Sequence, residues 1–132
     1  MQFQYKKFGQ FLRPVIPIKI KYNDVSVGYE VLVDSGADLC IFDAEIGELL
    51  GIDIESGRKN VVGGIAGQTA SYFTHQVEIE VGGWPYEIEA GFLPRVAGGF
   101  NYGVVGQKGF FDVFVVKFDL FKRSVELLYR KK

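Results

Sequence analysis

Apolar and polar residues alternate along several short stretches of the chain, which is the pattern of β-strands with one buried face. Isoleucine occupies every second position over 16–20, and residues 25–33 carry valine or tyrosine at every odd position. The same spacing recurs over 77–81 and over 84–92, with Gly82-Gly83 as the turn between them. This pattern predicts an all-β fold.

Shorter elements fill the space between these strands. Residues 43–50 predict a short helix, because Asp43 can cap its first turn and Gly51 can end it. Residues 58–73 predict a hairpin with Gly63 and Gly64 near its tip.

The carboxy-terminal third predicts mainly loops and a hairpin. A glycine-rich loop is expected over 94–102, a short strand at Val104-Val105 and one or two helical turns over 107–112. Residues 114–129 predict a hairpin that turns at 122–124. Since no repeat or linker interrupts the pattern, we expect residues 1–132 to form a single domain.

Composition narrows the class of protein. The chain has 132 residues, 48% of them hydrophobic, which is enough for a packed core. Lys and Arg number 15 against 16 Asp and Glu, so we expect no general attraction to nucleic acid or to a membrane surface. Cys40 is the only cysteine, which excludes an intrachain disulfide. We therefore expect a cytoplasmic protein, or a soluble domain trimmed from a longer chain.

The strongest chemical signal is Asp34-Ser35-Gly36-Ala37-Asp38, directly after the apolar Val31-Leu32-Val33. An apolar strand that runs into an acid places the carboxylate at a sheet end, and Gly36 lets the backbone turn sharply beside it. An ordinary Asx turn, in which Asp34 only caps the backbone, would have the same local sequence.

Stretches elsewhere in the chain favour the catalytic interpretation of the Asp34 motif. The chain resembles the retropepsin family, the retroviral-type aspartic proteases, along almost its whole length. The matching stretches occur in the family's order: Arg13 to Ile20, Leu32 to Asp38, Val62 to Gly67, Val77 to Val81, and Val104 to Gln107. The resemblance implies a closed β-barrel or sandwich with a flap hairpin.

The resemblance also implies a mechanism. Two aspartates share one proton, because like charges about 3 Å apart cannot both ionise. One activates a water that attacks the peptide carbonyl, and the other protonates the carbonyl oxygen; neither a metal nor another cofactor takes part. The chain has one Asp-Ser-Gly motif, so the second carboxylate has to come from a second copy, making the protein a homodimer that acts on peptides or proteins.

The resemblance assigns the remaining roles by position. The catalytic loop comprises Asp34, Ser35 and Gly36, and the serine hydroxyl is expected to bond across the two-fold axis. Substrate-binding positions are Ala37, Asp38, Gly63, Gly64 and Ile65. Support positions are Arg13 and Gly106, with Arg13 expected to reach Asp38 of the other copy.

Some positions depart from the family pattern. Gln107 stands where many members have arginine, so an intrachain arginine contact that supports dimer stability or loop rigidity is missing. The terminal hairpin is longer than the viral one and looks more like that of cellular or bacterial relatives. The alternatives are therefore a catalytically weak or inactive retropepsin-like domain for peptide binding or dimerisation, and an unrelated small β-barrel binding module.

The histidine and the cysteine of the chain do not indicate a second catalytic site. His75 is the only histidine, and Cys40 lies in an apolar run. We interpret them as an ordinary strand residue and a buried, inert thiol. A Cys–His nucleophile would require the two side chains to meet in space.

Overall fold

The structure is a computed structural model that describes residues 1–63, 69–94 and 102–130. Strands dominate it. They are β1 (Gln2–Gln4), β2 (Lys6–Phe8), β3 (Phe11–Arg13), β4 (Val15–Tyr22), β5 (Val25–Val33), β6 (Ile41–Asp43), β7 (Arg58–Gly63), β8 (Thr69–Val81), β9 (Trp84–Leu93), β10 (Gly103–Val105), β11 (Phe114–Asp119) and β12 (Ser124–Tyr129). One α-helix, α1 (Ala44–Leu49), and one 3₁₀ turn, η1 (Ile54–Ser56), follow β6.

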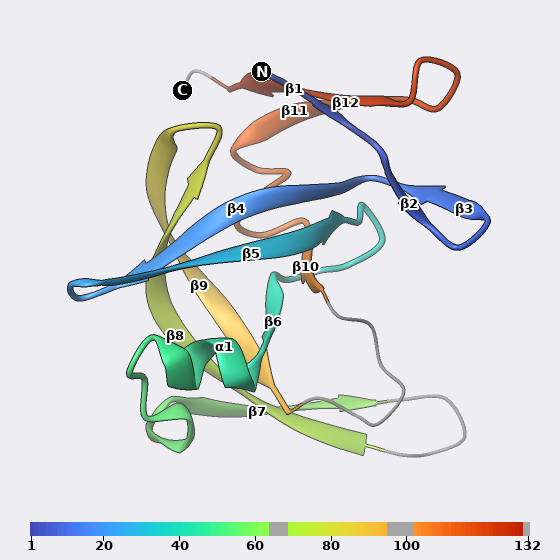
Figure 1. Cartoon of the computed structure of the whole chain (residues 1–132). Helices are drawn as coiled ribbons and strands as arrows, with labels where there is room; N and C mark the ends of the chain where they lie inside the picture. Colours follow the sequence, from blue (N-terminus) through green and yellow to red (C-terminus); the bar gives the residue numbers. More distant parts are fainter. Residues whose placement is uncertain (64–68, 95–101, 131–132) are drawn as a thin grey trace.

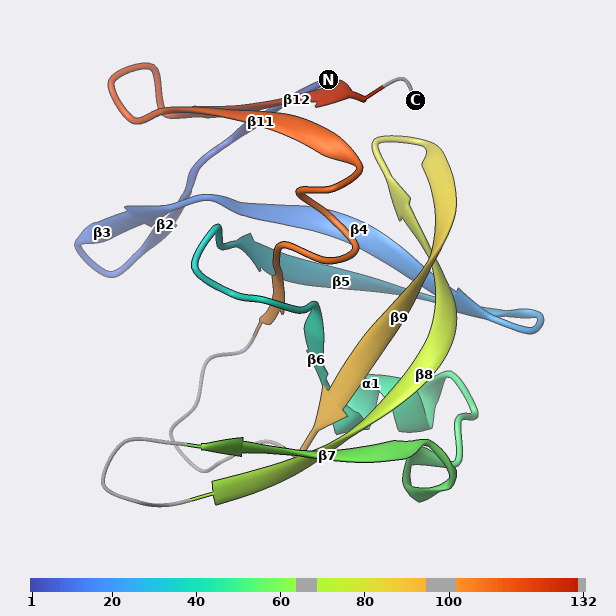
Figure 2. The ribbon, with the colours of Figure 1, turned by 180° about the vertical axis from the view of Figure 1, so that it is seen from behind.

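The all-β prediction is confirmed, and six strands close into a barrel, as the resemblance implied. Their order is β4-β5-β10-β6-β9-β8, and pairing between β8 and β4 closes the circle. Figure 1 shows β4 and β5 crossing one side of the barrel, and Figure 2 shows β8 and β9 on the other. β7 pairs with β8 outside this circle, forming the hairpin predicted over 58–73. Its tip, residues 64–68, lies outside the described residues.

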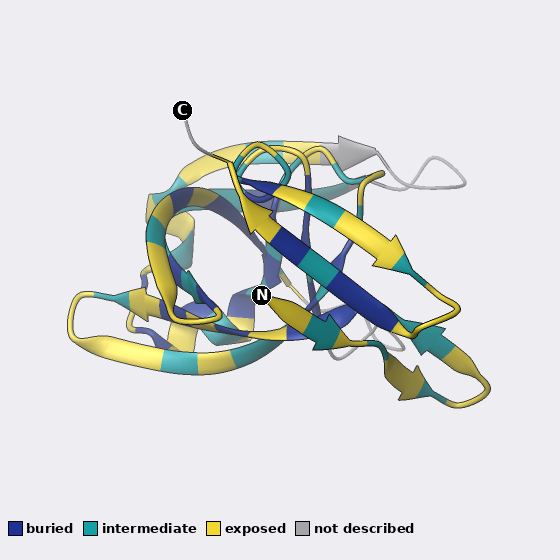
Figure 3. Ribbon diagram, turned by 90° about the horizontal axis from the view of Figure 1, so that it is seen from above, coloured by how far each residue is buried: buried dark blue, intermediate teal, exposed yellow. Residues whose placement is uncertain are grey.

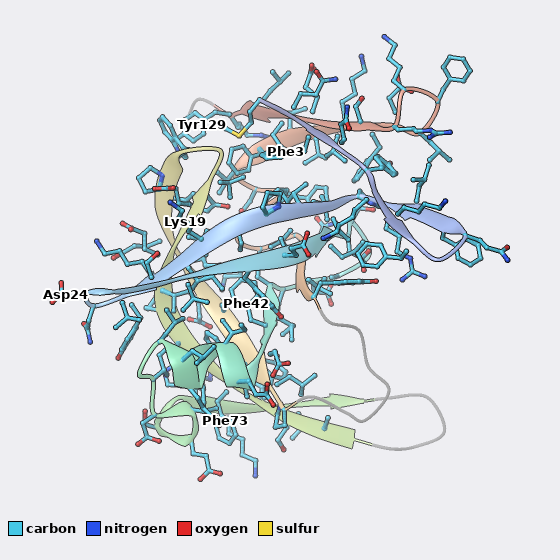
Figure 4. The ribbon with its side chains drawn as sticks, in the orientation of Figure 1. Phe3, Lys19, Asp24, Phe42, Phe73 and Tyr129 are labelled. Carbon is cyan, nitrogen blue, oxygen red and sulfur yellow. The ribbon has the colours of Figure 1, made fainter. Side chains whose placement is uncertain are left out.

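The barrel is filled by the alternating apolar positions. Ile16, Ile20 and Val31 are fully buried. Phe42 lies at the centre of the molecule (Figure 4), where its ring meets Phe92 edge to face, the centroids being 5.9 Å apart. The buried face of β5 fades toward its start because the β4–β5 hairpin, tipped by Asp24, projects beyond the barrel.

A smaller three-stranded sheet, in the order β1-β12-β11, joins the two ends of the chain. Its middle strand carries a buried stripe formed by Ser124, Val125 and Leu127 (Figure 3). The hairpin turn covers 120–123 rather than 122–124, because Ser124 already pairs with Asp119. Residues 6–13 also form the β2–β3 hairpin, in which Lys6 pairs with Arg13 and Phe8 with Phe11, and which the sequence pattern had not revealed.

The predicted helix is confirmed and the predicted helical turns are not. Asp43 caps α1 through a 2.9 Å bond from the Glu45 N–H, and Gly51, at φ +85°, follows its end. Residues 107–112 form turns instead of a helix. Gly109 has φ +103°, which no right-handed helix adopts, and Phe111 N–H reaches back five residues to the Gly106 carbonyl.

No helix in the part of the chain that the structure describes is long and apolar enough to cross a membrane.

Candidate active site

Asp34 follows the last residue of β5, where that strand runs parallel to β10. Val33 pairs with Val105, and the backbone N–H of Asp34 donates to the Val105 carbonyl at 3.0 Å. On its other side, Val33 N–H donates to Pro14 carbonyl at 2.9 Å. Neighbours on both sides therefore fix the start of the 34–38 loop, which turns away from the end of β5 (Figure 1).

The carboxylate of Asp34 is oriented by its own loop. The Gly36 N–H donates to Asp34 Oδ1 at 2.8 Å, and the Ala37 N–H donates to the Asp34 carbonyl at 3.2 Å. A Cβ on Gly36 would lie 3.2 Å from that same Oδ1, closer than an ordinary contact. The loop is thus an Asx turn in its local geometry, and the turn aims a half-buried carboxylate from a sheet end.

Gly106 packs closely against the backbone of the 34–38 loop and Leu39. A Cβ there would lie 2.4 Å from the Ala37 carbonyl oxygen and 2.6 Å from that of Leu39, so only glycine fits. This close approach lets the next two N–H groups pair with the loop. Gln107 N–H donates to the Ala37 carbonyl at 2.8 Å, and Lys108 N–H to the Asp38 carbonyl at 3.0 Å.

Gln107 also supports the loop with its side chain. Its Nε2 donates to the Ser35 carbonyl at 2.6 Å. The sequence had suggested that glutamine in place of arginine removes a contact and weakens the loop. The structure adds that the glutamine amide makes a different contact, with the 34–38 loop.

A buried cysteine and a partly buried tyrosine bind the carbonyls of the 106–109 segment. Cys40 Sγ donates to the Lys108 carbonyl at 3.4 Å, and the Tyr86 hydroxyl donates to the Gly109 carbonyl at 2.8 Å. Burial raises the pKa of Cys40 to about 11, and burial likewise raises the pKa of Tyr86. A thiol that stays protonated at neutral pH is a poor nucleophile, in keeping with the inert role predicted for it.

The other reactive or supporting positions are spread around the barrel. His75 Nε2 contacts the Ile54 carbonyl at 2.7 Å, so histidine and Cys40 have separate partners. Arg13 Nη1 donates to the Tyr102 hydroxyl at 2.6 Å. Gly63 is the last residue of β7, and the predicted substrate-binding positions Gly64 and Ile65 lie outside the described residues.

The loop faces solvent in the single chain. Ser35, Gly36 and Asp38 are exposed. A hollow of about 740 Å³ is lined by Pro17, Tyr29 and other residues of β4, β5 and the β8–β9 turn, and the 34–38 loop does not line it. Among residues 1–63, 69–94 and 102–130, no group of three His, Cys, Asp or Glu side chains is placed to hold a metal ion.

Comparison with known proteins places this geometry in a family. Residues 17–108, more than half of the chain and including the whole Asp34 loop and Gly106, match the model of the aspartyl protease family. The chain belongs to the aspartyl protease family. A search of curated protein sequences gave no match.

A solved structure shows the same fold. It is EIAV protease, a retroviral protease in complex with the inhibitor HBY-793, which superposes with a TM-score of 0.54. The match covers 76% of this chain and 88% of the viral chain, at 22% sequence identity. At this identity the likeness concerns the retropepsin fold and not the substrate.

Proposed function

We propose that this protein is an aspartic endopeptidase that acts as a homodimer and hydrolyses peptide bonds with a water held between two Asp34 carboxylates. The observation that carries the proposal is the Asp34 carboxylate at the end of β5, oriented by the Gly36 N–H. Family membership supports peptide hydrolysis as the reaction.

The chemistry needs two carboxylates in different protonation states. The ionised Asp34 takes a proton from the water, whose oxygen attacks the peptide carbonyl carbon. The protonated Asp34 donates to the carbonyl oxygen, giving a tetrahedral diol. Collapse of this intermediate breaks the C–N bond: the protonated Asp34 donates its proton to the leaving amine, and the other Asp34 takes a proton from a diol hydroxyl, which restores the starting state of the dyad. Protons balance, and no covalent enzyme intermediate forms.

A second copy supplies what the single chain lacks. The chain carries one Asp-Ser-Gly motif, and the loop around it is open to solvent. A partner loop across a two-fold axis would add the second carboxylate and cover the water. In this arrangement Ser35 bonds across the axis, Arg13 pairs with Asp38 of the other copy, and Ala37, Asp38, Gly63, Gly64 and Ile65 line the substrate groove.

The inactive-domain alternative rested on the missing arginine at position 107 and on the altered carboxy-terminal hairpin. The bond from the Gln107 side chain to the Ser35 carbonyl gives the loop a contact at that position, which supports the catalytic function against the first of these two grounds.

The proposal is tested by comparing the parent with Asp34→Asn on a peptide library from pH 3 to 8, with cleavage read by mass spectrometry. We expect the parent to cleave, Asp34→Asn to lose at least about 10³-fold, and the matched control Asp24→Asn to match the parent. Asp24 is exposed in the turn before β5, at the opposite end of that strand. Equal cleavage by Asp34→Asn, or a folded parent that cleaves nothing, would contradict the proposal.

A further inference from the structure

We infer that Gln107 is a positioning residue for the Asp34 carboxylate, acting through the peptide group that joins Ser35 to Gly36. This inference rests on the proposed function for its kinetic consequences. Its structural content is a chain of two hydrogen bonds across a single peptide plane.

The two bonds meet at opposite ends of that plane. Gln107 Nε2 donates to the Ser35 carbonyl oxygen at 2.6 Å, and the Gly36 N–H donates to Asp34 Oδ1 at 2.8 Å. The carbonyl and the N–H belong to the same rigid, planar peptide unit. Holding the carbonyl therefore limits rotation of the N–H, and polarisation along the chain strengthens the bond to the carboxylate.

The Gln107 side chain extends from a backbone segment that hydrogen bonds hold in place. Gly106 packs against the loop backbone, and the N–H groups of Gln107 and Lys108 pair with the Ala37 and Asp38 carbonyls. Cys40 and Tyr86 hold the carbonyls of the same segment from the barrel interior. The Gln107 side chain thus has a fixed origin although the residue itself is exposed.

The chemistry requires a donor at this position. A carbonyl oxygen only accepts hydrogen bonds, so the side chain must present N–H or O–H. Methionine has nearly the length of glutamine without a donor, arginine keeps a donor, and glutamate carries one only when protonated. These three substitutions separate the hydrogen bond from the mere presence of a side chain.

The first test measures kcat and KM of the parent, Gln107→Met and Gln107→Arg, with Gln76→Met as the control. Gln76 is exposed on β8, beside Lys21 and Asn23 near the start of β5. We expect Gln107→Met to lower kcat about three- to tenfold with little change in KM, and Gln107→Arg to restore most of the loss. A Gln107→Met enzyme with the parent's kcat overturns the inference.

The second test uses Gln107→Glu and the ratio of its kcat to that of the parent at each pH. Protonation converts the glutamate from an acceptor that repels the Ser35 carbonyl into a donor, so the ratio should rise as pH falls through about 4 to 5. The charged groups on the loop and its support are Asp34, Asp38, Lys108 and Asp112, and both proteins carry all four. A ratio that stays flat, or that rises equally for Gln107→Met, contradicts the inference.

A measurement independent of turnover separates this inference from the proposed function. Hydrogen exchange of the Gly36 amide, followed by NMR, should be faster in Gln107→Met than in the parent and in Gln76→Met. A parent that cleaves no peptide sinks the proposed function, and the exchange result still decides the role of Gln107. Equal exchange in all three proteins overturns that role, whatever the activity.

Discussion

At the scale of single residues, the site depends on a carboxylate that its own backbone orients. Gly36 serves Asp34 in two ways. Its N–H donates to Oδ1, and its lack of a side chain leaves room for that oxygen. The two interpretations of the Asp34 sequence, an acid at a sheet end and an Asx turn, are compatible in the structure. The Asx turn is the device that aims the acid, and the sheet end is what keeps it half-buried.

Substituting Gly36 tests this orientation. An alanine Cβ would crowd Oδ1 at 3.2 Å, so the carboxylate must shift by a few tenths of an ångström. We expect Gly36→Ala to lower kcat about tenfold or more, since small misplacements of a reacting group are costly. Gly28→Ala, where an added Cβ meets nothing within 4 Å, is the control on β5, the strand that leads into the loop. Equal losses in the two variants would mean that the carboxylate position is not the cause.

The buried thiol gives a prediction about stability. Burial raises the pKa of Cys40 from 9.0 to about 11, so the unfolded chain loses this proton at lower pH than the folded chain does. The contribution of the thiol to stability is complete below about pH 9 and is lost as pH rises toward 11, a loss of about 2 kcal/mol. Urea melts from pH 8 to 11 should show a shallower decline in Cys40→Ala than in the parent. Parallel declines would contradict the assignment.

At the scale of elements, β10 and the turn after it act as the base of the active-site loop. This base was predicted only in outline. The sequence placed a strand at Val104-Val105 and a supporting glycine at 106, but the contact of Gln107 with Ser35 joins residues far apart in the chain. No alternation or spacing encodes such a contact. The prediction of helical turns over 107–112 was wrong for a local reason: Gly109 has a positive φ, which a right-handed helix does not adopt.

Replacing Gly106 tests the role of this base. A Cβ at this position would meet two backbone carbonyl oxygens within 2.6 Å, and backbone cannot yield as a flexible side chain can. We expect Gly106→Ala to lower the free energy of unfolding by about 1–3 kcal/mol. Gly28→Ala serves again as control, and urea denaturation measures both. A Gly106→Ala protein as stable as the parent would show that the loop does not depend on this approach.

At the scale of the whole molecule, local patterns predicted the strands and missed how distant strands meet. The alternation over 16–20 and the caps of α1 appear in the structure as expected, whereas the alternation over 25–33 gives a buried face only at Val31 and Val33. The pairing of β8 with β4 that closes the barrel, and of β1 with β12 at the chain ends, is set by tertiary packing. Only the family resemblance anticipated the barrel.

Dimerisation gives a prediction at this scale. If each copy supplies one catalytic acid, specific activity should fall on dilution below the dimer dissociation constant, because monomers carry half a site. Activity measured over a dilution series should follow the dimer fraction obtained by analytical ultracentrifugation. Specific activity that stays constant in a range where the protein is monomeric would contradict the shared site.

The most direct test of the central claim is the distance between the two Asp34 carboxylates in a crystal of the dimer with a hydroxyl-containing peptide-like inhibitor. The account predicts that the two groups face each other across a two-fold axis at about 3 Å, with the inhibitor hydroxyl between them. Carboxylates that lie on separate surfaces of the assembly, with the inhibitor bound elsewhere, would contradict it.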